Sequence, residues 1–258
     1  MKISAILIAR NEAANIRACL ESIAWVDEII VVEQGSEDTT AHIAAECGAR
    51  VIQMQDWPGF GPQKNRGLEA ATGDWVLSID ADERVSPELA REIQQAITDA
   101  DASGQSVIFE LPRLTQFCGV WIRHCGWSPD PVLRVFRRGE ARFSDDLVHE
   151  RLVVQRKGSS LKLLKNRLEH YSYPTPEHYW RKLQRYSHDW AVQRHMQGQT
   201  TTMARAALSG LAAFTRSYLF RMGFLDGAMG FAVCTMQAQA AFGKYFELYC
   251  LERLNGKL

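Results

Sequence analysis

Residues 75–84 read WVLSIDADER, and this stretch decides the fold. Its apolar run ends in two carboxylates, Asp80 and Asp82, with Glu83 beside them. A short apolar run that ends in polar residues is typical of a buried strand reaching the edge of its sheet. Ligands of open α/β sheets bind outside the carboxyl ends of the strands, where paired carboxylates suit Mg²⁺ or Mn²⁺. An Asp-x-Asp pair alone is common by chance, and a strand running into a helix capped at Ser86 is the simpler alternative.

The sequence before this stretch alternates between strand and helix patterns. The predicted strands are residues 2–9, 28–33 and 51–54, and the predicted helices are residues 39–47, 62–71 and one that begins at Asn11. The second strand, EIIVVE, is almost continuously apolar, as expected for a strand buried on both faces. This alternation predicts an α/β fold with a mostly parallel sheet and helices on both faces.

Polar residues follow three of the predicted strands. They are Asn11 and Glu12 after the first strand, residues 33–38 after the second, and residues 80–83 after the fourth. Because the carboxyl ends of parallel strands meet at one edge of a sheet, we expect these three groups to converge. The sequence has neither Gly-x-Gly-x-x-Gly after the first strand nor Gly-x-x-x-x-Gly-Lys-Ser/Thr, so it lacks the dinucleotide fingerprint and the P-loop.

The charges of the chain are divided unequally between its two halves. Residues 1–112 contain 8 Lys and Arg against 19 Asp and Glu, whereas residues 113–258 contain 22 against 11. An acidic half suits a metal ion, and a basic half suits phosphates or anionic lipid, although an incidental surface bias would give the same counts. A hydrophobic content of 46% excludes a disordered chain.

The six cysteines show no Cys-x-x-Cys spacing. Neither a zinc site nor a disulfide framework is indicated, so we expect reduced thiols in the cytoplasm. The first residues, MKISAILIARNE, lack a small-residue cleavage site and are expected to form a strand rather than a signal peptide.

Three segments together resemble the family 2 glycosyltransferases with the GT-A fold. They are ILIARNEAANIRACLESI at 6–23, IIVVEQGSEDTTAHIA at 29–44 and GFGPQKNRGLEAATGDWVLSIDADE at 59–83. The resemblance is strongest to the bacterial branch that adds glucose in β-1,4 linkage to the inner-core heptose of lipopolysaccharide. It implies a Rossmann-like GT-A domain, an inverting transfer from UDP-glucose or a related donor, and a peripheral enzyme on the inner face of the cytoplasmic membrane.

The resemblance also implies a set of donor-site residues. The uridine site would be lined by Ala9, Arg10, Asn11, Glu12, Glu33 and Ser36, and the rest of the nucleotide sugar would meet Lys64, Asn65, Asp80 and Ala81. Mg²⁺ or Mn²⁺ would be held by Asp80 and Asp82. His149 would complete the metal site or contact the donor phosphates, although a lone histidine is usually structural. The family usually has Asp at the position of Glu33, whose extra methylene shifts its contact with uracil or ribose.

An inverting transfer needs a carboxylate that takes the proton of the acceptor hydroxyl. The family carries a Glu-Asp pair and a following Arg, and this chain has Pro129, Asp130 and then Arg134 at the corresponding place. Asp130 is therefore the first candidate for the catalytic base. Its competitor is Glu150, which ends a Val-His-Glu motif typical of this branch.

The predicted domains are a glycosyltransferase domain at 1–172 and an amphipathic helical region at 173–258. The first divides into a nucleotide-sugar and metal half at 1–112 and an acceptor-side segment at 113–172, which is rich in Trp, Arg, His and Gly. Aromatic side chains there suit sugar rings, although packing against the sheet is the simpler explanation for Trp121.

The C-terminal region is predicted to be helical and basic. Its longest uncharged run in the last segment, residues 227–243, is too short and polar for a spanning helix, which needs ~20 apolar residues. A helix lying on the membrane surface is expected, with a helical cap or a dimer interface as the alternative. The basic half would then bind the phosphorylated, lipid-linked core and the anionic leaflet.

Two other functions remain open from the sequence. A noncatalytic nucleotide-sugar-binding or scaffold protein would explain the departures at Glu33 and Pro129. The same enzyme class acting on a different glycan, a lipid carrier or a protein is the second alternative. The expected partners are a UDP-sugar, a lipid-linked saccharide and an anionic membrane surface, with a homo-oligomer possible and no nucleic acid.

Overall fold

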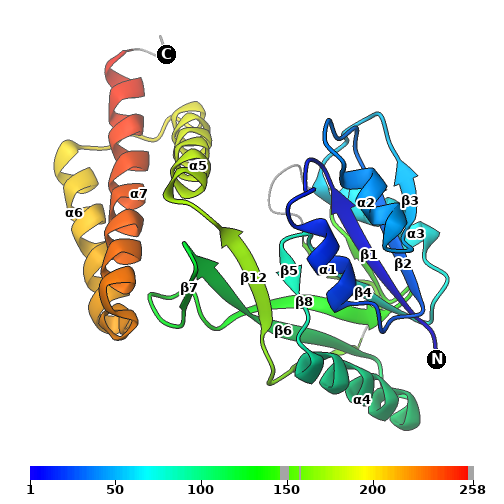
Figure 1. The fold of residues 1–258 in the computed structure, drawn as a ribbon. Helices are drawn as coiled ribbons and strands as arrows, with labels where there is room; N and C mark the ends of the chain where they lie inside the picture. Colours follow the sequence, from blue (N-terminus) through cyan, green and yellow to red (C-terminus); the bar gives the residue numbers. More distant parts are fainter. Residues whose placement is uncertain (146–150, 157, 255–258) are drawn as a thin grey trace. The chain divides into compact units, whose positions relative to one another are not determined.

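The computed structural model describes residues 1–145, 151–156 and 158–254 (Figure 1). The chain forms two compact units, each made of two segments. Unit 1 comprises Met1–Arg113 and Asp130–His170, and unit 2 comprises Leu114–Pro129 and Tyr171–Leu258.

This division differs from the predicted domains in one respect. We expected residues 113–172 to form a single acceptor-side segment, whereas residues 114–129 belong to unit 2. The physical reason is packing, because Phe117 and Cys125 share a buried apolar core with Tyr179 of the helical region.

Unit 1 is organised around a sheet with the strand order β3-β2-β1-β4-β8-β6-β12-β5. The parallel strands are β1 (Ile3–Ala9), β2 (Glu28–Glu33), β3 (Arg50–Gln53) and β4 (Trp75–Ser78). The other strands in this order are β5 (Glu83–Arg84), β6 (Val107–Phe117), β8 (Asp130–Arg137) and β12 (Leu168–Tyr173). Strand β8 runs antiparallel to both β4 and β6, so the sheet is mixed beyond β4.

Shorter strands extend this framework. Strand β6 also pairs with β7 (Val120–Ile122) and β11 (Ser160–Leu163), and β9 (Ala141–Phe143) pairs with β10 (Leu152–Val154). The helices of unit 1 are α1 (Ile16–Ser22), α2 (Thr40–Glu46), α3 (Phe60–Ala70) and α4 (Pro87–Ser103).

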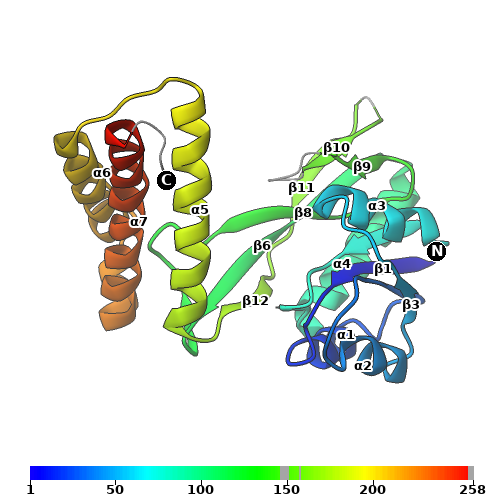
Figure 2. The same ribbon diagram turned by 90° about the horizontal axis from the view of Figure 1, so that it is seen from above.

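Helices cover both faces of the parallel strands. Ala5 and Leu7 of β1 belong to a buried core that includes Leu20 of α1. Ile6 belongs to a second core, against which Leu68 of α3 packs. Successive side chains of a strand point to opposite faces, so α1 and α3 lie on opposite sides of β1, as Figure 2 shows. The predicted α/β sheet with helices on both faces is therefore confirmed.

Of two predicted helix caps, the structure confirms one and contradicts the other. The Ser86 hydroxyl accepts a hydrogen bond from the N–H of Leu89 at 3.2 Å and caps α4, as predicted. The prediction that Asn11 caps the first helix was wrong, because α1 begins only after Asn15. Asn11 instead has a φ of 55°, a left-handed conformation that asparagine tolerates better than most residues, and its side chain serves the loops described below.

Unit 2 is mainly helical. Helix α7 (Gly227–Arg253) packs against α5 (Pro176–Met196) and α6 (Met203–Thr215), and Figure 1 shows α7 between the other two. The break between α6 and α7 contains a π-helical turn, η1 (Arg216–Phe220), and a 3₁₀ turn, η2 (Gly223–Asp226). Within the described ranges no single helix is long and apolar enough to cross a membrane. The bent pair Met203–Phe220 and Gly223–Arg253 reaches that length and apolar composition only when its two helices are taken together.

The aromatic residues of unit 2 contact one another. The Trp127 ring lies 5.4 Å from that of Tyr173 and 6.0 Å from that of Phe117, between ring centroids. Trp121 packs in the same way on Tyr171, at 5.2 Å. These contacts favour the packing interpretation of the aromatic segment over a sugar platform for these two tryptophans.

Candidate active site

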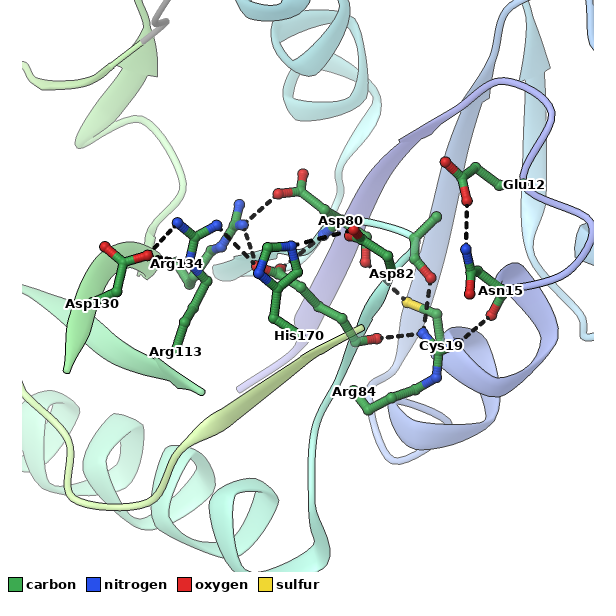
Figure 3. Close-up of polar contacts among 12 residues, drawn as sticks. Glu12, Asn15, Cys19, Asp80, Asp82, Arg84, Arg113, Asp130, Arg134 and His170 are labelled. Atoms are coloured by element: carbon green, nitrogen blue, oxygen red, sulfur yellow. Dashed lines mark hydrogen bonds and ion pairs between the residues drawn. The ribbon is translucent and has the colours of Figure 1, made fainter. Parts of the chain in front are cut away.

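Five charged side chains of unit 1 form one connected group, called here the ion-pair cluster: Lys64, Asp80, Glu83, Arg113 and Arg134. Arg134 Nη2 lies 2.5 Å from Asp80 Oδ2 and 2.6 Å from Glu83 Oε1. Lys64 Nζ lies 3.2 Å from Asp80 Oδ1, and Arg113 Nη1 lies 3.7 Å from Glu83 Oε1. Figure 3 shows the labelled members converging from separate strands. The cluster therefore stands where β4 ends, as the sequence predicted for the Asp-x-Asp segment.

The cluster lies in a poorly hydrated environment. Burial raises the pKa of Glu83, and the charge of Asp80 adds to this while Arg134 opposes it. Burial also acts to raise the pKa of Asp80, but the charges of Arg134 and then Lys64 outweigh it and hold that pKa below its usual range. Asp80 thus remains a carboxylate, with both of its oxygens in ion pairs.

Asp130 is joined to the same cluster through Arg113. Its Oδ2 accepts hydrogen bonds from Arg113 Nε at 3.0 Å and from Arg113 Nη2 at 2.5 Å. Asp130 opens β8 and Arg113 lies directly opposite it on β6, so the antiparallel register fixes the pair. The side chain of Asp130 is 43% exposed, which leaves it accessible to a substrate hydroxyl.

A second carboxylate of the Asp-x-Asp segment meets a histidine. Asp82 Oδ2 lies 3.2 Å from Nε2 of His170, and the pairing of β12 with β5 places His170 opposite Glu83. No group of three or more potential ligands arranged for a metal ion is found in residues 1–145, 151–156 and 158–254. Mg²⁺ is often held by one or two protein carboxylates and completed by substrate phosphates and water. Asp82 therefore fits a cation that binds together with a nucleotide diphosphate, and His170 lies beside it.

The loops that follow β1 and β2 are tied together by hydrogen bonds. The N–H of Asn11 donates to the Ser36 hydroxyl at 3.0 Å, and the N–H of Glu37 donates to the Asn11 side-chain oxygen at 2.9 Å. The N–H of Ser36 in turn donates to Glu33 Oε1 at 2.5 Å. The register of β1 with β2 pairs Ala9 with Glu33 and brings these loops side by side. The structure thus brings together the residues predicted to hold uridine, including Arg10 and Glu12 in the same loop.

Glu12 connects these loops to the Asp-x-Asp segment. Burial raises the pKa of Glu12, the hydrogen bond from Asn15 opposes this, and the charge of Asp82 raises the pKa further. Arg84 fixes the same region by donating to the carbonyl oxygens of Ala81 and Asn15, each at 2.8 Å. Figure 3 shows Glu12, Asn15 and Arg84 on this side of the site.

Not every predicted residue points to this site. Asn65 clamps strand β9, because its amide donates to the carbonyl of Phe143 at 2.9 Å and accepts from the N–H of Phe143 at 3.0 Å. Its side chain thus holds unit 1 together, in contrast to the predicted donor contact. Ala81 is buried. His149 and Glu150, the other predicted ligand and the competing base, lie outside the described residues.

Residues 4–114 match the family model described as Glycosyl transferase family 2. This part of the chain is therefore similar to the family 2 glycosyltransferases. The chain is 29% identical over 254 residues to uncharacterized glycosyltransferase RP128 of Rickettsia prowazekii (strain Madrid E), covering 96% of this chain and 86% of the relative. It is 31% identical over 165 residues to lipopolysaccharide core biosynthesis glycosyltransferase LpsC of Rhizobium meliloti (strain 1021), covering 60% of this chain and 58% of LpsC.

Two solved structures are similar at a coarser level. One is glucosyl-3-phosphoglycerate synthase from Mycobacterium tuberculosis in complex with Mn²⁺, UDP-glucose and phosphoglyceric acid, with a TM-score of 0.36, 32% identity, and coverage of 42% of this chain and 43% of that chain. The other is residues 1–349 of TarS from S. aureus, with a TM-score of 0.46, 15% identity, and coverage of 99% and 92%. The match to the synthase spans less than half of its length. Similarity at this level does not indicate which ligands this chain binds.

Sequence reasoning missed two side chains that the structure places at the candidate site, Arg113 and His170. Arg113 was seen only as part of an aromatic and basic segment, and His170 was not singled out. Both are placed by strand pairing between distant segments, Arg113 with Asp130 and His170 with Glu83. Arg113 gave a local signal, a cation in the mostly apolar strand segment VIFELPRLTQF, whereas the strand LEHYSY gave none for His170.

Proposed function

We propose that this chain is a glycosyltransferase that moves a hexose, with glucose the first candidate, from a UDP-sugar to a hydroxyl of the lipopolysaccharide inner core with inversion at the anomeric carbon. The observation that carries the proposal is the attachment of Asp130, through Arg113, to the ion-pair cluster at the end of β4. Asp130 is therefore a partly exposed carboxylate that is connected to the Asp-x-Asp segment, and we propose that this segment faces the donor. The resemblance to the inner-core branch and the partial likeness to LpsC support the choice of acceptor.

In the proposed step, Asp130 takes the proton of the acceptor hydroxyl. The hydroxyl oxygen forms the new bond to the anomeric carbon as the bond from that carbon to the UDP oxygen breaks, and UDP leaves with the electron pair. The two hydrogen bonds from Arg113 fix the carboxylate for this approach. A positioned general base contributes roughly 10²–10⁴-fold to a rate.

Asp82, with His170 beside it, would hold Mg²⁺ or Mn²⁺, which supplies Lewis-acid neutralisation of the charge on the departing diphosphate. Lys64, which pairs with Asp80, is the lysine that would meet a phosphate oxygen. Asp80, held between Lys64 and Arg134, keeps both cations at the site. In this proposal Asp80 positions Lys64 and Arg134, in addition to making the metal contact that the sequence predicted.

The first test is a donor screen with the purified full chain. Thermal stabilisation would be measured with UDP-glucose, UDP-galactose, UDP-N-acetylglucosamine and GDP-mannose, each with Mn²⁺, with Mg²⁺ or with EDTA. The expected result is metal-dependent stabilisation by one UDP-sugar that disappears in Asp82→Ala and persists in Asp99→Ala, a carboxylate exposed on α4. Stabilisation that persists in EDTA would remove the metal from the proposal. A folded protein that responds to no nucleotide sugar would favour the noncatalytic scaffold.

The second test concerns the acceptor. With the identified donor, transfer to lipopolysaccharide inner core would be followed by the mass of the product, with core lacking the heptose region as the control. Transfer to the heptose-containing core alone supports the acceptor. Donor binding without transfer to this core would leave the enzyme class in place and point to another glycan, a lipid carrier or a protein.

A further inference from the structure

Unit 2 exposes an unusual number of apolar side chains along α6 and the turns that follow it. Leu211 is 64% exposed and Phe220 is 78% exposed. The complete set, called here the apolar face, comprises Met203, Leu208, Leu211, Leu219, Phe220, Met222, Phe224 and Leu225. Single exposed leucines are common on proteins, but neighbouring exposed apolar side chains mark an interaction surface, and Leu208, Leu211 and Phe220 line one hollow.

The apolar face is not the side of α6 that holds unit 2 together. Ala206 and Gly210 are buried on the opposite side. A Cβ added at Gly210 would lie 3.2 Å from the carbonyl oxygen of Ala238 and 3.2 Å from the Cβ of Phe242, so α6 already packs closely on α7. A helix that is apolar on its packed side and again on its outer side requires a second apolar environment.

The outer side of α6 is also hollowed. A shallow cavity of about 560 Å³ is lined by Leu208, Leu211, Ala212, Thr215, Arg216 and Phe220. All of these residues come from α6 and η1, and Arg216 is the one charged residue among those that line it. The surface is therefore open, apolar and edged by a cation, without a carboxylate to bind a cationic ligand.

The charge around this face has one sign. Residues 190–225 contain no Asp or Glu and carry Arg194, Arg205, Arg216 and Arg221. The last three are exposed and lie within or beside the apolar face. Apolar side chains bordered by arginines match the interface of a bilayer, where acyl chains lie below anionic headgroups.

We propose that the α6–η1–η2 segment lies in the interfacial region of a bilayer containing anionic lipid, with the apolar face among the acyl chains and Arg205, Arg216 and Arg221 at the headgroups. The proposal rests on unit 2 alone and is independent of the donor and acceptor chemistry. It assigns to named side chains the membrane-surface contact that the sequence predicted only for the helical region as a whole.

A second copy of the chain fits this face less well. A two-fold symmetric dimer places the same patch on both sides, so the cations of one copy would face those of the other. No acidic residue within 190–225 is available to offset that repulsion. Anionic headgroups supply the opposite charge, which is why the bilayer is the favoured occupant.

Vesicle co-sedimentation with the full chain tests the proposal. Vesicles of phosphatidylglycerol and phosphatidylethanolamine would be compared with vesicles of phosphatidylcholine. Binding to the anionic vesicles is expected to fall by about tenfold or more in Leu211→Glu and in Phe220→Glu, because a charge replaces a buried apolar group. Arg216→Gln is expected to weaken binding by about fivefold, and only for anionic vesicles.

Leu161→Glu is the matched control, because Leu161 is 56% exposed but lies on β11 of unit 1. Circular dichroism and a cooperative thermal unfolding transition would verify that each variant is folded. Three outcomes would overturn the proposal: no binding of the wild-type chain to anionic vesicles, equal loss in Leu161→Glu, or a lipid-free dimer in light scattering that Leu211→Glu dissociates. The last would assign the face to a second copy of the chain.

Discussion

The ion-pair cluster of unit 1 and the apolar face of unit 2 are built from opposite kinds of side chain. Unit 1 places Glu83 and Arg134 inside, where each charge has a partner within a few ångströms. Unit 2 packs aromatic rings inside and leaves Leu211 and Phe220 outside. Buried charge is costly unless it is paired, and exposed apolar surface is unfavourable in water. In each region an unfavourable arrangement has a proposed purpose. The buried charges would serve the nucleotide-sugar chemistry, and the exposed apolar side chains would contact the bilayer.

The largest expected effect tests whether the charge in unit 1 serves catalysis. Asp130→Asn removes the proposed base while keeping the shape of the side chain, and we expect the transfer rate to fall by about 10²–10⁴-fold with donor affinity unchanged. Initial rates at saturating donor would measure this, with Asp99→Asn as the control for loss of a carboxylate. A variant that retains most of the rate would move the role of base to Glu150, tested by Glu150→Gln.

The next effect tests whether the charges of unit 1 depend on one another. Arg134→Met leaves the carboxylates of Asp80 and Glu83 without their shared guanidinium. Breaking a buried ion pair in this way destabilises a fold by about 3–5 kcal/mol.

Urea unfolding at neutral pH would measure the change. Arg91→Met is the control, because Arg91 pairs with Glu88 on the exposed side of α4 and such pairs contribute about 0–1 kcal/mol. Equal losses in the two variants would mean that the cluster is no more than a surface ion pair.

A smaller effect tests how unit 2 holds α6 against α7. Gly210→Leu would force the side chain against Ala238 and Phe242, and overpacking of this kind costs about 1–3 kcal/mol. Gly243→Ala on α7 has no atom within 4 Å of the added Cβ, so it should stabilise the helix by about 0.5–1 kcal/mol. Thermal unfolding of both variants would show opposite shifts. A stabilised Gly210→Leu would contradict the close helix contact.

The smallest effect concerns an exposed ion pair between α5 and α7. His188 Nδ1 lies 2.5 Å from Glu247 Oε1, and this hydrogen bond, followed by the charge of Glu247, raises the pKa of His188. Because the pKa is higher in the folded state than the usual value of about 6.5, the stabilisation is complete below about pH 6.5 and is lost as the pH rises through the folded value.

The melting temperature of His188→Gln should therefore fall further below that of the wild type at about pH 6 than at about pH 9. The difference should be small, since both side chains are partly exposed and screened by solvent. A gap that does not change with pH would show that the pair does not stabilise unit 2.

The sequence by itself determined the strands, the helices and the polar loops of the first half of unit 1. Apolar periodicity is local, so EIIVVE and WVLSIDADER predict buried strands without knowledge of their neighbours. The parallel order then follows from the alternation of strands and helices. Asp80 and Asp82 could be identified for the same reason, since they stand at the end of a recognisable strand, whereas Asp130 was identified from the resemblance to the family.

Tertiary structure decided which side chains meet. Arg113 reaches Asp130, and His170 reaches Asp82, only because antiparallel pairing joins strands that are distant in the chain. The loop role of Asn11 depends on Ser36 and Glu37, so the helix-cap rule misplaced it.

The orientation of α6 was also undetermined by its sequence. Its residues are apolar on nearly every side, so periodicity could not tell which of them face α7 and which face outward. The small residues Ala206 and Gly210 allow the closest approach of the two helices, and this packing turns Leu208 and Leu211 outward. Strand pairing and helix packing join residues that are distant in the sequence. The sequence therefore predicted which types of residue form the site, but not which side chains contact one another.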